Sequence, residues 1–241
     1  MSARRFFVEG VRRSGEAVTI GGADAHKIVN VLRLHDGAHL EIVDSAGALF
    51  DATVETSDGE VRATLRDELP RDDQSGRAIV EIAQAVPKGQ KMDFVVEKAT
   101  ELGAAAILPF TSERTVASAE GTAKLERWRR LGKSAAQQCG RRDVPRIDAP
   151  IPFAQLLERF ADYDAVIFPW ELAPQVPVRE TLAGMLESAH RVLVVVGPEG
   201  GFSHEEAEEA KARGARLVWL GRRILRTETA AMVLLAVLEY L

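Results

Sequence analysis

Hydrophobic and polar residues alternate along much of the first 70 residues. Val61, Ala63 and Leu65 are separated by polar or charged residues, which is the period-two pattern of a half-buried strand. The residues 44–47, Asp-Ser-Ala-Gly, supply turn chemistry between two such strands. This region is therefore predicted to form a small β-barrel that carries one short helix. The predicted strands cover residues 4–9, 17–20, 38–43, 48–55 and 60–68, and the predicted helix covers residues 24–32.

From residue 78 onward, apolar strands alternate with helices. Val192 to Val196 form an unbroken apolar run, which is typical of a strand in a parallel sheet covered on both faces. The pattern therefore predicts an α/β fold for this part of the chain. The predicted strands cover residues 78–85, 105–110, 165–168, 191–196 and 216–220, and the predicted helices cover 92–102, 123–139, 153–160, 178–186, 204–213 and 229–241.

Residues 70–76 carry polar and turn-forming side chains and are predicted to be a linker. We therefore predict two domains, residues 1–72 and residues 73–241. The last predicted helix is apolar on all sides, so we expect it to be buried in the core or against a partner subunit.

Composition and apolar runs narrow the class of protein. Hydrophobic residues make up 46% and charged residues 28%, which is the balance of a globular protein and excludes a disordered chain. The longest apolar run, Ala230 to Leu238, is about half of a membrane span. The first residues contain no signal-peptide core, and one cysteine, Cys139, permits no internal disulfide. These features indicate a soluble protein of the cytoplasm.

The net charge of −5 conceals an uneven distribution of charge. Residues 36–73 hold eleven acids and three bases, whereas residues 124–146 hold eight bases and two acids. The first 33 residues hold six bases and three acids. Two separate basic regions on an acidic protein are typical of a protein that binds a polyanion at defined places, although a single basic run is more often a solvated helix face.

A glycine-rich loop, residues 197–203 (Gly-Pro-Glu-Gly-Gly-Phe-Ser), follows the most apolar strand. Ser203 and Glu206 have the spacing of a capping box for the next helix. The carboxyl edge of a parallel sheet is where ligands bind, and glycines let the backbone approach a ligand closely. The loop matches neither dinucleotide nor triphosphate fingerprints, and the acids after it would repel phosphate. We therefore expect an uncharged or cationic ligand, with a simple helix-capping turn as the alternative.

A second loop, residues 220–229, also lies at a strand end and leads into the apolar helix. Thr227 or Thr229 is predicted to cap that helix, and the carboxylate of Glu228 suits the helix dipole. Spacing alone favours capping over catalysis for Thr227 and Glu228. Arg226 stands beside an apolar Ile-Leu pair, so we expect it to contact the ligand.

The helix predicted over residues 123–139 carries two stripes. Leu125, Trp128, Leu131 and Ala135 form an apolar stripe, which predicts that Trp128 lies in the core. The second stripe offers donors to phosphates and base edges through Arg127, Arg130, Ser134, Gln137 and Arg141. Neither a metal site nor a G-x-S-x-G nucleophile is indicated, and we expect Cys139 to be a buried structural residue.

Several motifs together resemble the bacterial 16S ribosomal RNA uracil-N3 methyltransferases. The resemblance runs essentially from end to end, and its most specific stretches are Lys-Ala-Thr-Glu-Leu-Gly (98–103) and Gln-Cys-Gly-Arg (138–141). The other matching positions are residues 5–7, 26, 31–33, 37, 87–89, 92–93, 112–114, 144–145, 197–203 and 223–230.

The resemblance implies an N-terminal PUA-like RNA-binding barrel and a C-terminal SPOUT domain with a trefoil knot. It also implies a homodimer that uses S-adenosylmethionine, a cation without phosphate, and acts on 16S rRNA of the small ribosomal subunit. The residues it assigns to the cofactor are Leu108, Pro109, Gly197, Pro198, Glu199, Gly200, Gly201, Leu220, Gly221, Ile224, Leu225, Arg226, Thr229 and Ala230.

The expected reaction moves a methyl group to uracil N3, which lies on the Watson–Crick edge and must be unpaired. Arg226 is our candidate for stabilising negative charge on the base, with Arg114 or Arg141, from either subunit, as alternates. Glu199 and Glu228 are candidates for the general base. The residues assigned to RNA are Arg4, Arg5, Arg33, Arg114, Arg127, Arg130, Gln138, Arg141 and Arg142.

Two other functions remain open on the sequence. A related methyltransferase acting on a ribose 2′-OH of tRNA or rRNA would share the two C-terminal loops. A non-catalytic RNA-binding or assembly factor could keep the fold, although the intact loops argue against it.

Overall fold

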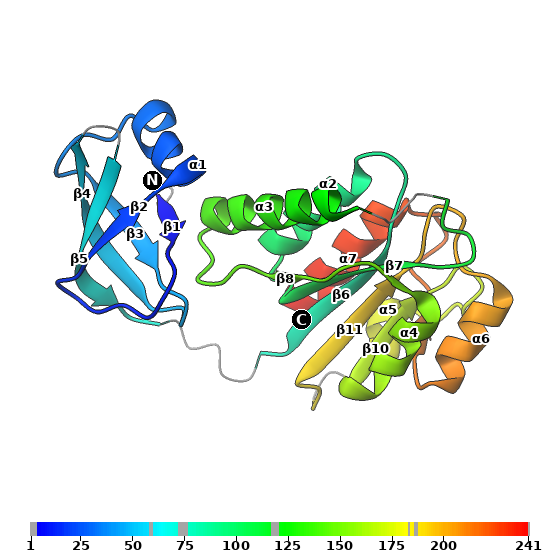
Figure 1. Ribbon diagram of the computed structural model, residues 1–241. Coiled ribbons are helices and arrows are strands. Elements are labelled where there is room, and N and C mark those ends of the chain that lie inside the picture. The colour runs from blue at the N-terminus through cyan, green and yellow to red at the C-terminus, as the bar shows by residue number, and fades with distance from the viewer. Residues whose placement is uncertain are drawn as a thin grey trace. The chain divides into compact units, whose positions relative to one another are not determined.

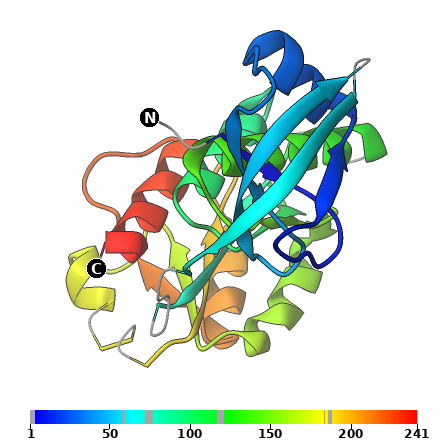
Figure 2. The same cartoon turned by 90° about the vertical axis from the view of Figure 1, so that its left-hand side faces the viewer.

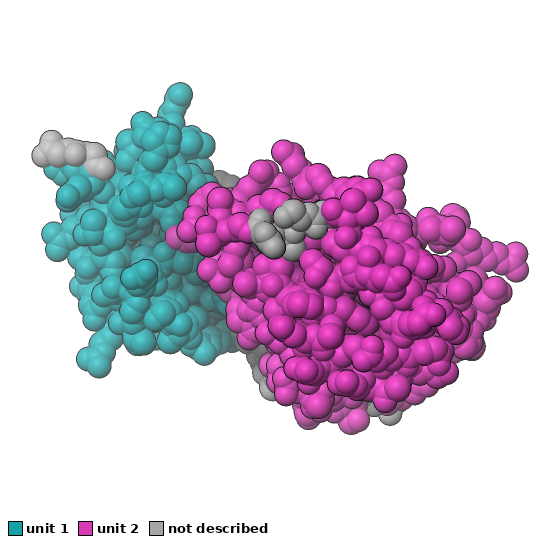
Figure 3. Space-filling model, turned by 45° about the vertical axis from the view of Figure 1, so that its right-hand side comes forward, with its two compact units in different colours: residues 1–74, 136–143 teal, residues 75–135, 144–241 magenta. Residues whose placement is uncertain are grey.

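The change of pattern near residue 70 corresponds to a division of the computed structural model into two units (Figures 1 and 3). The structure describes residues 4–57, 60–71, 77–116, 121–182, 184–185 and 188–240. Unit 1 comprises Met1–Gln74 and Ala136–Asp143, and unit 2 comprises Ser75–Ala135 and Val144–Leu241. Most of the predicted linker, residues 72–76, lies outside the described residues.

Unit 1 is built on the predicted alternating strands. Its five-stranded sheet has the order β1-β3-β4-β5-β2, with β1 parallel to β3 and the other pairs antiparallel. The sheet curls around an apolar core, so the expected barrel-like sheet is observed (Figure 2). Its strands are β1 (Arg5–Phe7), β2 (Ala17–Ile20), β3 (His39–Val43), β4 (Leu49–Ser57) and β5 (Glu60–Leu69).

The predicted helix of unit 1 is present in two parts. Helix α1 (Gly22–His26) continues into a π-helical turn, Lys27–Val31. Ile28 in that turn is fully buried in the core of the unit. The hydrophobic pattern therefore predicted the position of the helix but not that its second half is a π-helix.

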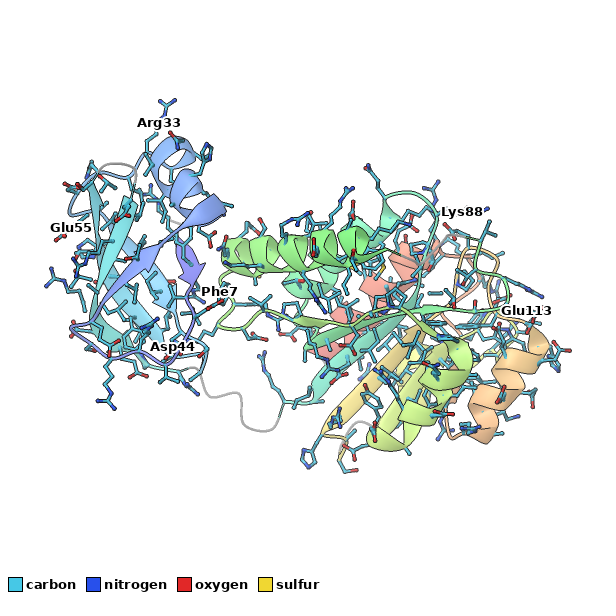
Figure 4. The ribbon with its side chains drawn as sticks, viewed as in Figure 1. Phe7, Arg33, Asp44, Glu55, Lys88 and Glu113 are labelled. Carbon is cyan, nitrogen blue, oxygen red and sulfur yellow. The ribbon has the colours of Figure 1, made fainter. Side chains whose placement is uncertain are left out.

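The predicted turn between β3 and β4 is confirmed, and a buried carboxylate holds it. Asp44 accepts hydrogen bonds from the backbone N–H groups of Ala46 and Ala48, each at 2.9 Å, and from that of Arg12 at 2.9 Å (Figure 4). Gly47 has a φ of +76°, a conformation that favours glycine. Two donors from the turn itself and one from the distant Arg12 thus satisfy the buried carboxylate.

Unit 2 contains the predicted parallel sheet. Its order is β12-β10-β11-β6-β7-β8, with β9 also paired to β7, and every pair is parallel. The two-residue strands β8 and β9 were not predicted, because so short a segment has no periodicity. The strands are β6 (Ile79–Ala85), β7 (Ala106–Thr111), β8 (Arg146–Ile147), β9 (Ile151–Pro152), β10 (Ala165–Pro169), β11 (Arg191–Val196) and β12 (Arg216–Val218).

Helices cover both faces of this sheet, as the apolar strands predicted (Figure 1). One face packs against α2 (Lys91–Glu101), α3 (Thr122–Cys139), α5 (Val178–Leu182) and α7 (Thr227–Tyr240). The other packs against α4 (Phe153–Glu158), which continues into a 3-10 turn at Arg159–Asp162, and α6 (His204–Ala212). Trp128 of α3 is 4% exposed, so its predicted place in the core is confirmed.

Helix α7, predicted to be buried in the core or against a partner subunit, is only partly buried within this chain. Ala231, Leu234 and Leu235 are buried where the helix packs on α2, β6 and β11, but Val233 is 36% exposed. Within this chain the helix is thus buried along one face. Among the described residues, no helix has the length and hydropathy needed to cross a membrane.

Candidate functional site

The carboxyl ends of the parallel strands bring the predicted cofactor segments to one edge of the sheet. Gln84 of β6 lies in register with Val196 of β11 on one side and with Pro109 of β7 on the other. Gly197 follows Val196 directly, so the glycine-rich loop starts beside Gln84 and Pro109. The side chain of the predicted residue Leu108 lies in the core on the α4 and α6 face, next to Pro109 in β7.

Close packing explains the first glycine of the loop. A Cβ atom on Gly197 would lie 2.9 Å from Cε2 and 3.0 Å from Cδ2 of Phe202. The Phe202 ring is held by other rings, with its centroid 4.1 Å from that of Phe168 and 6.2 Å from that of Phe110. The backbone can therefore follow this path beside the ring only without a side chain at residue 197.

The predicted capping box at the end of the loop is confirmed. The Ser203 side chain accepts from the N–H of Glu206, and the Glu206 carboxylate accepts from the N–H of Ser203 at 3.0 Å. Glu206 also accepts from the N–H of Glu113, at 2.9 Å, in the loop after β7 (Figure 4). The nearly buried carboxylate thus joins the two loops.

Arg114 strengthens this connection. Its guanidinium donates to the carbonyl oxygens of Gly200, at 3.0 Å, and of Phe202, at 3.3 Å. A Cβ atom on Gly200 would lie 3.3 Å from the Arg114 Cβ. The side chain that we assigned to RNA therefore holds the backbone of the glycine-rich loop.

Thr227 joins the second loop to the first. Its hydroxyl donates to the carbonyl oxygen of Gly197 at 2.6 Å and accepts from Gln84 Nε2 at 2.8 Å. The two loops predicted to form one site therefore meet. The predicted cap is wrong for Thr227, because helix α7 already begins there, and the Arg226 carbonyl accepts the N–H groups of Thr229 and Ala230, each at 2.9 Å.

Two acidic side chains and one lysine lie at this junction. Glu199 Oε1 accepts from Lys91 Nζ at 2.9 Å and from the N–H of Lys88 at 3.0 Å (Figure 4). Lys91 Nζ also lies 3.8 Å from Glu228 Oε2. Burial opposes ionisation of Glu199, but these donors outweigh it, and the pKa of the carboxyl is lowered.

The remaining predicted cofactor residues lie on the second loop. Arg226 and Thr229 are exposed, and Ile224 is 93% exposed, which is unusual for an apolar side chain. Gly221 has a φ of +104°, a backbone conformation that favours glycine. Leu220, Leu225 and Ala230 are partly buried. The site thus combines exposed backbone, an exposed arginine and paired acidic groups.

Sequence reasoning missed Gln84 and Lys91. Gln84 is the polar exception in the buried run from Ile82 to Val86, and that exception was a usable signal. Lys91 had no comparable signal, because a lysine at the start of a helix is usually solvated. Its pairing with Glu199 and Glu228 depends on three segments that are distant in sequence.

The residues assigned to RNA divide into two groups. Arg4, Arg33, Arg130 and Gln138 are exposed, and Arg33 points away from unit 1 (Figure 4). The others also hold partners within the protein: Arg5 binds Glu41 and the Gly140 carbonyl, Arg114 the glycine-rich loop, Arg127 binds Asp93, Arg141 binds Asp143, and Arg142 binds the Leu69 and Pro70 carbonyls.

Cys139 is exposed, so the expected buried role is wrong. It lies at the end of α3, where the chain turns at Gly140 with a φ of +82°. Across the part of the chain that the structure describes, no group of His, Cys, Asp and Glu side chains is arranged to hold a metal ion.

A family model described as an RNA methyltransferase domain matches residues 75–239. "Ribosomal RNA small subunit methyltransferase E" of Bacillus subtilis is 31% identical, and the match covers 98% of this chain and 96% of that protein. The protein of the same name from Mycobacterium tuberculosis is 32% identical, with 98% and 90% covered.

Solved structures agree with these relatives. A ribosomal RNA small subunit methyltransferase E from Neisseria gonorrhoeae, bound to S-adenosyl methionine, is 28% identical with a TM-score of 0.86 and covers 98% of this chain and 97% of its own. A putative methyltransferase from Legionella pneumophila with the bound cofactor SAM is 27% identical with a TM-score of 0.87, and 99% and 98% are covered. Both hold the cofactor that the sequence predicted for this chain.

Proposed function

Since this chain belongs to the ribosomal RNA small subunit methyltransferase E family, we propose that it methylates N3 of a uridine in 16S rRNA, using S-adenosylmethionine. The junction of the two loops through Thr227 and Gly197 is the observation that carries this proposal, because it forms one site from the two predicted segments. The contact lies at the carboxyl edge of a parallel sheet, where ligands bind.

The residues at this edge fit the cofactor. The loop carries three glycines at places where a side chain would crowd its neighbours. A Cβ atom would lie 3.3 Å or less from a neighbouring side chain at each of Gly197, Gly200 and Gly201. Oε2 of Glu228 is buried without a hydrogen-bond partner, and Glu199 is ionised nearby, so the site suits a cation. The two loops, residues 197–201 and 220–230 together with Pro109, would hold the cofactor, which supplies an electrophilic methyl group on sulfur when bound.

Arg226 is the proposed stabiliser of negative charge on the base. Uracil N3–H is neutral at pH 7, so it must lose its proton, and the charge then spreads to the two carbonyl oxygens. Arg226 is exposed at the start of α7, on the loop joined to Gly197, where a base could reach its guanidinium. A fixed cationic donor at that place lowers the energy of the charged base.

Glu228 is the better candidate for the general base. Glu199 Oε1 already accepts hydrogen bonds from Lys88 and Lys91, and its lowered pKa opposes proton uptake. Glu228 Oε2 has no hydrogen-bond partner, although Lys91 lies 3.8 Å away. We assign Glu228 to accept the N3 proton and Glu199 to hold the loop against Lys91.

The finer features of the family belong to the same proposal. Residues 1–72 are proposed to be the PUA-like RNA-binding domain, and residues 73–241 a SPOUT domain with a trefoil knot. The proposed homodimer is supported by Phe94 and Val233, which are exposed apolar residues on the packed helices α2 and α7. Arg4, Arg33 and Arg130 are exposed and suited to phosphate contacts in the small ribosomal subunit of the cytoplasm.

The test uses labelled S-adenosylmethionine with free 16S rRNA and with small ribosomal subunits, followed by mapping of the modified nucleoside. A methyl group that stays with the uracil base supports the proposal. A methyl group on ribose would indicate the 2′-O-methyltransferase instead, and absence of both cofactor binding and transfer would indicate a non-catalytic assembly factor.

Two variants test the proposed roles. Arg226→Ala should lower methyl transfer about 100-fold or more while calorimetric binding of S-adenosylmethionine persists, as for loss of a key donor. Unchanged transfer would remove Arg226 from the mechanism.

Glu228→Gln should lower transfer by about 100-fold or more and flatten the acid limb of the pH–rate profile. Glu199→Gln is the matched control and should retain that limb. If Glu199→Gln flattens it and Glu228→Gln does not, the two roles are reversed.

A further inference from the structure

Gln84 is a polar side chain in the most buried part of the sheet. It is 0% exposed and lies between Val196 and Pro109 in register. Its Nε2 atom donates to the carbonyl oxygen of Ala85 at 2.9 Å and to the hydroxyl of Thr227 at 2.8 Å. Because the Ala85 carbonyl can only accept, the amide nitrogen must face it, and this fixes the orientation of the amide.

The Gln84 amide starts a chain of hydrogen bonds with one direction. Thr227 Oγ1 accepts from Gln84, so its own hydrogen is available for the carbonyl of Gly197, 2.6 Å away. Residue 198 is proline, which has no N–H, so this carbonyl is the only hydrogen-bonding group of the peptide unit between residues 197 and 198. The hydroxyl of Thr227 therefore anchors the peptide at which the chain leaves β11 for the glycine-rich loop.

The burial of Gln84 lowers the free energy of unfolding, and an apolar residue at this position would not. Its Oε1 atom is buried without a hydrogen-bond partner. An unsatisfied buried acceptor lowers the stability of the folded state, and an apolar side chain of similar size would avoid that loss. Apart from its bond to the neighbouring Ala85 carbonyl, the hydrogen bond that Gln84 makes is directed at the loop, through Thr227.

We propose that Gln84 is a positioning residue that fixes the Gly197 carbonyl through Thr227 and so holds the glycine-rich loop ready for the cofactor. This inference rests on the proposed function for the identity of the cofactor. It assigns no contact between Gln84 and the ligand, because the side chain is fully buried. Without Gln84, the Thr227 hydroxyl oxygen no longer accepts a hydrogen bond that orients it. Its hydrogen is then free to point away from the Gly197 carbonyl.

The test compares three variants with the wild-type protein. Gln84→Leu removes the start of the chain, Thr227→Val removes its middle link at nearly constant size, and Thr227→Ser keeps the hydroxyl. Binding of S-adenosylmethionine is measured by calorimetry, stability by thermal unfolding, and loop order by hydrogen exchange of the amides of residues 199–203 without ligand.

Gln84→Leu and Thr227→Val should each weaken cofactor binding at least 10-fold and speed exchange of the loop amides. Thr227→Ser should stay within about 2-fold of wild type, and the double variant should be no weaker than the weaker single one, because the two residues act as one unit. The melting temperature of Gln84→Leu should equal or exceed that of wild type.

Unchanged affinity and unchanged loop exchange in Gln84→Leu would overturn the proposal. So would a lower melting temperature with unchanged affinity, since that is the result of a purely structural residue. If Gln84→Leu does not fold, Thr227→Val against Thr227→Ser decides by the same two measurements. If wild type binds no S-adenosylmethionine, the proposed function fails, and hydrogen exchange still tests the role of Gln84.

Discussion

The contact between Gly197 and Phe202 permits a quantitative prediction for Gly197→Ala. The added methyl carbon would meet three atoms of the Phe202 ring at 2.9, 3.0 and 3.3 Å. The ring cannot move freely, because Phe168, Phe110 and Phe153 surround it. Gly197 does not have a positive φ, so the steric contact is the only structural obstacle to alanine.

The expected loss of stability follows from two opposing terms. Overpacking of a well-packed core costs about 1–3 kcal/mol. Replacing glycine by alanine reduces the freedom of the unfolded chain and returns about 0.4–1 kcal/mol. We therefore expect a net loss of about 1–2 kcal/mol, which corresponds to a decrease in melting temperature of about 2–8 °C for a chain of this size.

Thermal unfolding of the purified variants measures this loss of stability. Calorimetry measures their affinity for S-adenosylmethionine, which should fall if the methyl group displaces the loop. Gly200→Ala is the control in the same loop: its Cβ atom would lie 3.3 Å from the nearest atom, Arg114 Cβ, rather than 2.9 Å, so its loss should be smaller. Phe202→Leu should relieve the clash, so the double variant should be at least about 1 kcal/mol more stable than the sum of the single effects predicts. A Gly197→Ala protein as stable as wild type, or an additive double variant, would refute the packing argument.

Two further predictions concern charge. The lowered pKa of Glu199 means that its ionised form stabilises the folded state: this contribution is complete above the ordinary value of 4.5 and is lost as the pH falls through the lower folded pKa. The melting temperature of wild type should therefore exceed that of Glu199→Gln by a constant amount at neutral pH, and the gap should close as the pH falls from 4.5 through the lower folded pKa; a gap that widens in acid would contradict this. RNA affinity should fall steeply with salt, and Arg33→Ala and Arg130→Ala should each reduce the slope of log affinity against log salt by about 0.7–0.9. Arg213→Ala, at the residue directly after α6 and near Glu209, is the control and should leave the slope unchanged.

The regular elements were predictable because burial imposes a period on the sequence. The alternation in β5 predicted the sheet of unit 1, and the apolar run of β11 predicted the sheet of unit 2. The capping box of Ser203 and Glu206 predicted the start of α6. Strands β8 and β9 were missed because two residues define no period. The start of α7 was placed two residues late, because a threonine at a helix start is more often a cap than a link between loops.

The site was only partly predictable, because several of its contacts join distant segments. The two loops could be identified by their glycines and their place after strands. The pairing of Lys91 with Glu199, and the hold of Arg114 on Gly200, depend on how neighbouring strands align their carboxyl ends. A basic residue in the sequence gives no indication of whether it binds a carbonyl of its own chain or an external phosphate.

The exposure of Cys139 has a practical consequence. It is the only cysteine in the sequence and stands at the end of α3, next to Gln138 and close in sequence to Arg141, two residues assigned to RNA. A maleimide dye would therefore attach at a single known position without any substitution. Fluorescence from that dye would respond to RNA only when the nucleic acid approaches the end of this helix, and so would map where the substrate lies on the protein.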